Sequence, residues 1–177
     1  SDEGNTVAVS FAAPAAVPVS GSALAPTRVE LSFGSEDWFS AGDVLFYTVP
    51  TAQSVKPTSL PFAGDETVEL LVSSPTPLPK RYAPIIELGL WGEPRNAVRV
   101  PAAVSKGQTR GSYVVTFRAP ALWVDRGAKA EPVRVALSLD QGLHWAPAEA
   151  PLVYFGRASV TAVAPQVASV DGGCRLR

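Results

Sequence analysis

The side chains with the greatest potential for chemistry are few and widely spaced. His144 is the only histidine of the 177 residues, and Cys174 is the only cysteine. A metal site or a nucleophile activated by histidine needs partner side chains at suitable spacing, and none accompany His144. We therefore expect His144 to cap a hairpin in solvent and Cys174 to be a buried structural cysteine. The sequence predicts no catalytic residue, no metal ligand and no cofactor.

Acidic side chains gather at one place, around Glu36, Asp37 and Asp43. Calcium takes about six to eight oxygen ligands, and two or three scattered carboxylates fall short of that number. We expect these groups to be solvated charges of a hairpin loop.

Composition excludes several classes of function. Hydrophobic residues make up 46% of the chain and charged residues only 18%, against roughly 25% charged in ordinary domains, which indicates a folded chain with a core. The formal net charge is −1 and there is no basic stripe, so nucleic acid is not an expected partner. No stretch approaches the ~20 consecutive apolar residues of a membrane span, so no membrane insertion is expected within this segment. The compartment stays open between a cell-surface or extracellular setting and a ciliary or cytoskeletal one.

The elements that position these residues are predicted to be short strands. Apolar side chains alternate with polar ones at period two, which is typical of strands with one buried face, over residues 67–72, 86–90, 98–100, 113–117 and 133–139. Between them lie turn formers: three prolines interrupt residues 73–79, and residues 91–94, 105–108 and 125–127 are expected to be turns or loops. Residues 140–142 are expected to form a hairpin turn with Gly142 at positive φ. The pattern predicts an all-β chain of immunoglobulin-like antiparallel β-sandwiches.

The chain also repeats itself at domain length. Residues 28–33 match 134–139, and residues 7–14 match 113–120, both at an offset of 106 residues. Further matches follow in the same order at offsets of 107 or 108: Trp38 with Trp145, Pro57 with Pro165 and Gly64 with Gly172. This period is too long for a solenoid unit, so each repeat is expected to be a whole domain. We expect residues 1–49 to be the C-terminal part of one repeat, 50–156 a complete repeat and 157–177 the start of a third.

Four short motifs of the central repeat stand out: Ala63-Gly64-Asp65, Pro120, residues 138–142 and residues 154–155. In this order they resemble the IPT/TIG family of immunoglobulin-like repeats. Ala63-Gly64-Asp65 stands where that family opens with a glycine pair, and Pro120 matches its strand-ending proline. Its Ser-x-Asp-Gly hairpin corresponds to residues 138–142, and its closing aromatic pair to residues 154–155. Filamin-type repeats are the second resemblance. The resemblance implies the sandwich fold and transfers no catalytic residue.

Two tryptophans are the candidate contact residues. Trp91 lies in an expected loop and Trp123 in a strand connection, and the position that matches Trp123 in the first repeat is Val17, so the shared fold does not require that tryptophan. Exposed aromatic side chains anchor interfaces, and burial against a neighbouring repeat is the alternative. Trp145 recurs as Trp38, which favours packing in each repeat.

Together these patterns predict a non-enzymatic structural or adhesive module that spaces parts of a longer protein and binds protein partners, including neighbouring repeats. The alternative is a carbohydrate-binding accessory domain that uses Trp91 or Trp123 as a stacking platform. A DNA-contacting domain is disfavoured by the charge balance.

Overall fold

A computed structural model describes residues 8–14, 26–34, 37–90, 93–122 and 130–156, together with residues 162, 164, 166 and 167. Every regular element among these residues is a β-strand, which confirms the all-β prediction. None of the described residues forms a helix of the length and apolarity needed to cross a membrane.

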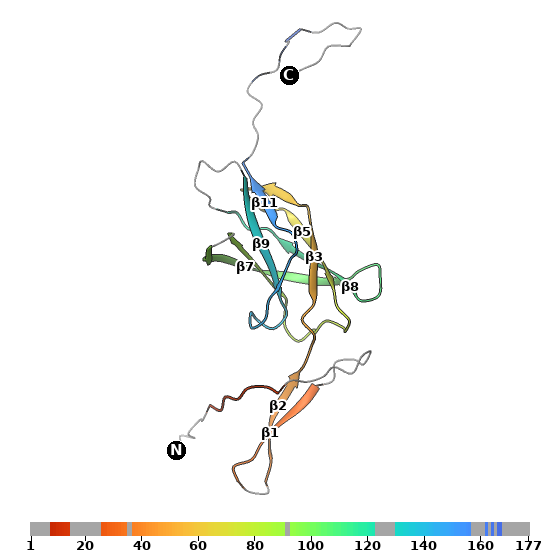
Figure 1. Ribbon diagram of the computed structural model, residues 1–177, viewed down its shortest axis with the longest axis vertical. Coiled ribbons are helices and arrows are strands. Elements are labelled where there is room, and N and C mark those ends of the chain that lie inside the picture. Colours follow the sequence, from red (N-terminus) through yellow and green to blue (C-terminus); the bar gives the residue numbers. More distant parts are fainter. Residues whose placement is uncertain are drawn as a thin grey trace, which may run out of the picture.

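The strands belong to two separate sheets (Figure 1). A two-stranded antiparallel hairpin is formed by β1 (Pro26–Leu31) and β2 (Phe39–Leu45). All other strands form one sheet, which we call the body: β3 (Thr51–Lys56), β4 (Ser59–Pro61), β5 (Thr67–Ser73), β6 (Ile85–Leu90), β7 (Glu93–Lys106), β8 (Ser112–Arg118), β9 (Ala130–Ser138), β10 (Ala146–Pro147) and β11 (Leu152–Phe155). The hairpin lies beyond the end of the body at which β3 begins.

The strand order of the body is β3-β5-β8-β7-β6-β9-β11-β4, with β10 paired to β9. Strand β7 joins its two halves, because residues up to Pro101 pair with β6 and residues from Ala102 onward pair with β8. Proline has no N–H to donate, and Pro101 lies where the strand changes partner. The sequence predicted a loop through Pro94, but β7 already begins at Glu93 and is 14 residues long, so this boundary was wrong.

The first strand of this order, β3, also approaches the segment between β10 and β11 at the other end. An isolated bridge joins Ala52 of β3 to Ala148, and the Glu149 N–H donates to the Ala52 carbonyl at 3.3 Å. On the far side of the body, β4 pairs in parallel with β11. The sheet is therefore strongly curved and nearly closes on itself.

One hydrophobic core fills the space between the strands, and the predicted faces supply it. In β5 the side chains of Val68, Leu70 and Val72 are fully buried, while Thr67 and Glu69 between them are exposed. The fully buried large side chains come from β4, β5, β6, β8, β9 and β11: Tyr154, Leu60, Leu70, Ile86, Leu88, Leu137, Leu152, Val68, Val72, Val115, Val133 and Val135. Each fully buried aliphatic side chain contributes about 1.5–3 kcal/mol relative to exposure. The period-two pattern thus identified the core face correctly.

Candidate functional site

The junction between hairpin and body carries the densest side-chain hydrogen bonding of the described residues. Tyr47 lies in the segment that leads from β2 into β3, and its hydroxyl donates to Asp140 Oδ2 at 2.7 Å. Asp140 lies in the loop after β9, 93 residues away in sequence. The bond therefore ties the segment leaving the hairpin to one end of the body.

Asp140 is the centre of this network. Its Oδ1 accepts from the Ser138 hydroxyl and from the His144 backbone N–H, both at 2.9 Å. Its Oδ2 accepts from His144 Nδ1 at 2.6 Å in addition to the Tyr47 hydroxyl. Burial by itself raises the pKa of the Asp140 carboxyl, but the hydrogen bonds from His144, Tyr47 and Ser138 outweigh burial and hold the pKa well below its usual range. Burial and then the bond to Asp140 raise the pKa of the Tyr47 hydroxyl.

The local sequence explains why the loop after β9 presents this carboxylate. Ser138 Oγ accepts from the Gly142 backbone N–H at 2.8 Å, which closes the turn. Gln141 and Gly142 both have positive φ, at 61° and 94°, and glycine adopts that conformation without steric cost. The predicted hairpin turn and the positive φ of Gly142 are confirmed. His144 is exposed at the hairpin, as predicted, but it is paired with Asp140.

A second contact and an apolar groove accompany the network. Arg81 donates from a guanidinium N–H to the Asp43 carbonyl at 2.9 Å, joining the body to β2. The groove between hairpin and body has a volume of about 420 Å³ and is lined mainly by apolar side chains, among them Leu45, Phe46 and Leu143. Such an arrangement can hold two structural units in a defined orientation. The described part of the chain contains no cluster of three or more His, Cys, Asp or Glu side chains that could hold a metal ion.

The structure does not describe the two candidate contact residues. Trp91 and Trp123 lie outside the described residues, as do Cys174 and Glu36. Trp145 is partly buried, with the Arg99 guanidinium 5.1 Å from the centre of its ring. No sequence signal paired Tyr47 with Asp140, although residue 140 belonged to the predicted turn.

No protein-family model matches this chain, and no curated protein matches it in sequence.

Loss of the Tyr47 hydroxyl is expected to loosen the hairpin and to weaken the body only modestly. In Tyr47→Phe we expect the free energy of unfolding of the body to fall by about 1 kcal/mol, the net value of one hydrogen bond, because the ring still packs against the core. The backbone amides of residues 26–45 should show lower heteronuclear NOE values, because the bond to Asp140 is gone. Tyr82→Phe is the matched control, since that hydroxyl makes no hydrogen bond to the described residues. Unchanged relaxation of the hairpin in Tyr47→Phe would show that the bond does not hold it.

Proposed function

We propose that this chain is part of an array of immunoglobulin-like β-sandwich repeats, a non-enzymatic spacer and protein-binding scaffold. Strand order supports the sandwich. The path β3-β5-β8 with the second half of β7 matches one sheet of an immunoglobulin-type domain, and β6-β9-β11 matches the other.

The observation that carries the proposal is the shared register of two hairpins. Leu31 of β1 lies opposite Phe39 of β2, and Leu137 of β9 lies opposite Ala146 of β10. These are the positions that the sequence repeat equates, and the next pairs toward the strand ends, Glu30 with Ser40 and Ala136 with Pro147, also correspond. A one-residue slip would reverse every side chain, so an equal register near the turn supports two copies of one architecture.

The two stretches differ in burial at matched positions. Phe11 is 59% exposed, whereas its counterpart Phe117 is 3% exposed in the core of the body. Phe33 is 75% exposed, and its counterpart Leu139 is 3% exposed. Large exposed apolar side chains in such a pattern mark a surface that is covered elsewhere. We infer that residues 1–49 present the inward face of a preceding sandwich, with 50–156 as the complete repeat and 157–177 as the beginning of the next.

The junction explains how such repeats could act as a spacer. The Tyr47–Asp140 bond and the Arg81–Asp43 bond hold the segment between units against the body. Rigid units with restrained junctions keep the parts of a longer protein on either side at a set distance. The exposed sheet edges and loops offer binding surfaces to other proteins and to neighbouring repeats.

Mechanical unfolding tests the spacer. A polyprotein of repeated residues 46–156 is pulled in an atomic-force instrument. We expect one force peak per copy with a contour-length gain of roughly 35 nm, because residues 51–156 extend by at most ~3.6 Å each. Unfolding at no measurable force, or in many small steps, would contradict a load-bearing unit.

A further inference from the structure

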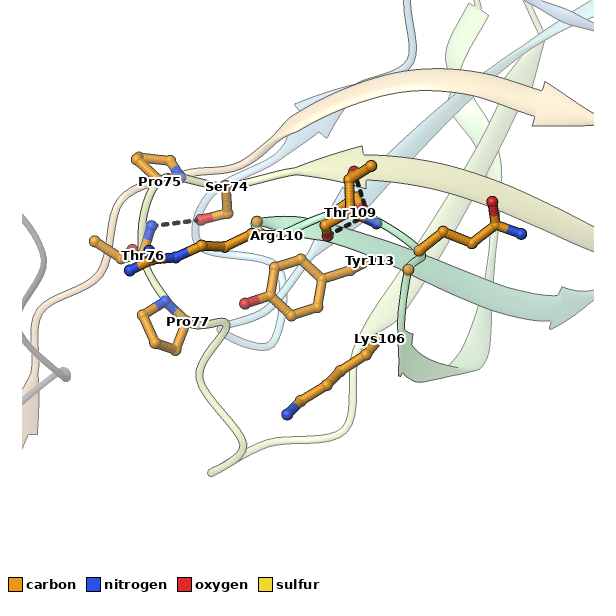
Figure 2. A pocket seen from close by; sticks show the side chains of 12 residues that line it. Ser74, Pro75, Thr76, Pro77, Lys106, Thr109, Arg110 and Tyr113 are labelled. Carbon is orange, nitrogen blue, oxygen red and sulfur yellow. Dashed lines mark hydrogen bonds between the residues drawn. The ribbon is translucent and has the colours of Figure 1, made fainter.

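A second hollow lies on the body, lined by residues that take no part in the Tyr47–Asp140 network. Its walls are residues 74–77, which follow β5, and residues 106–113, which join β7 to β8, and its volume is about 420 Å³ (Figure 2). We call it the β5–β8 hollow. Neither the spacer proposal nor the sequence patterns assign it a role.

The charge of this hollow differs from that of the whole chain. Lys106 and Arg110 line it, and none of its lining residues is acidic, although the chain as a whole carries a net charge of −1. Neither cation makes an ion pair or a hydrogen bond with the described residues. Two unpaired cations at one concave surface attract a negatively charged group.

Two residues that line the hollow carry hydroxyl groups without a partner among the described residues. Thr76 is only 6% exposed, and its Oγ1 is buried without a hydrogen-bond partner among the described residues. A buried hydroxyl without a partner costs about 1–3 kcal/mol, so such groups are rare unless something else satisfies them. Figure 2 shows the side chains of Arg110 and Tyr113 both reaching toward the segment that carries Thr76. The Tyr113 hydroxyl likewise has no partner among the described residues.

The walls of the hollow are held in place by backbone bonds. The Ser74 N–H donates to the Gly111 carbonyl at 2.9 Å, which ties one wall to the other. Gly111 has a φ of +80°, and a Cβ there would lie 2.9 Å from the Ser74 carbonyl oxygen. On the opposite side, the Gly107 N–H donates to the Ser112 carbonyl at 2.9 Å. The hollow is therefore a defined feature of the fold.

We propose that the β5–β8 hollow binds an oxyanion, that is a carboxylate, sulfate or phosphate group. The guanidinium of Arg110 offers paired N–H donors for two oxygens, and Lys106 adds a second positive charge. The hydroxyls of Thr76 and Tyr113 supply donors for the remaining oxygens. The faces of Pro75, Pro77 and Tyr113 offer apolar contact to the rest of an organic ligand, and the volume admits a group about as large as a monosaccharide.

The test is a titration of the full 177-residue chain, followed by amide chemical shifts at constant ionic strength. The probes are inorganic phosphate, inorganic sulfate and glucuronate, with glucose as the neutral control. We expect saturable shifts confined to residues 74–77 and 106–113 for at least one anion and none for glucose. Tightest binding by an inorganic ion identifies a free anion as the ligand, and tightest binding by glucuronate identifies an organic carboxylate.

Two variants make the result specific. Arg110→Ala should weaken binding about tenfold or more, because it removes a charge-assisted pair of donors. Thr76→Val keeps the shape of the side chain and should weaken binding about threefold without lowering stability. Arg134→Ala, on the exposed face of β9, is the matched control and should bind as the parent chain does. Absence of saturation, equal shifts with glucose, or undiminished binding by Arg110→Ala would overturn the proposal.

Discussion

Substitution of Gly64 by alanine is expected to destabilise the body by about 2–5 kcal/mol. Gly64 has a φ of +64°, a left-handed conformation that costs other residues roughly 1–2 kcal/mol. A Cβ there would lie 2.5 Å from the carbonyl carbon and oxygen of Pro120 and 2.6 Å from the Ala121 nitrogen. All three are backbone atoms, so relief requires movement of the chain, and such overpacking costs about a further 1–3 kcal/mol. Urea denaturation followed by circular dichroism measures the loss.

The close approach at Gly64 has a structural purpose. The Asp65 N–H donates to the Ala119 carbonyl at 2.8 Å, and the Ala119 N–H donates to the Glu66 carbonyl at 2.9 Å. These bonds join the turn before β5 to the segment after β8, so displacement of this turn disturbs the pairing of β5 with β8.

Gly89→Ala is the matched control for Gly64→Ala. Gly89 lies in β6 at ordinary φ, and its added Cβ would meet the Ala97 Cβ at 3.6 Å, a normal contact distance. We expect a change of less than about 1 kcal/mol. Equal urea midpoints for the two variants would refute the close-approach argument.

Removal of the Tyr154 side chain is expected to have the other large effect, about 3–5 kcal/mol for Tyr154→Ala. Tyr154 is fully buried, and its ring stacks on that of Phe62 at 6.5 Å between centroids. Its hydroxyl donates to the Pro120 carbonyl at 3.0 Å. Tyr154→Phe keeps the ring and should lose only about 1 kcal/mol, the net value of one hydrogen bond. Equal losses in the two variants would show that the ring contributes nothing.

Tyr154 also predicts how stability responds to alkali. Burial raises its pKa from 10.0 to about 12, so the folded state retains the phenolic proton at a pH where the unfolded chain has lost it. Its contribution is therefore complete below about pH 10 and is lost as the pH rises toward 12. In Tyr154→Phe the decline across this range should be smaller than in the parent chain. Part of the decline should remain, because the pKa of Tyr47 is raised as well.

Local pattern was sufficient for the buried faces of several strands. Alternation in residues 67–72 predicted which side chains of β5 enter the core, because successive side chains of a strand point to opposite faces whatever the strand pairs with. The turn at residues 140–142 was equally predictable, since glycine at positive φ and a serine hydroxyl that closes the turn are local requirements.

The sequence did not predict in the same way which strands pair with each other. Nothing in residues 93–106 showed that one strand would leave β6 at Pro101 and continue on β8. The tryptophans drew attention because large aromatic side chains anchor interfaces, yet the arrangements that the structure describes are built from Tyr47, Asp140 and Thr76.

By itself the sequence determined an all-β chain, the buried faces of several strands, the turn at residues 140–142 and a correspondence between two stretches 106 residues apart. Only the tertiary structure decided that Tyr47 meets Asp140 and that residues 74–77 and 106–113 enclose a cationic hollow. The physical reason is the distance along the sequence over which each feature is decided. A strand's period and a turn's φ depend on neighbouring residues, whereas a contact across 93 residues depends on how all the intervening strands pack around one core.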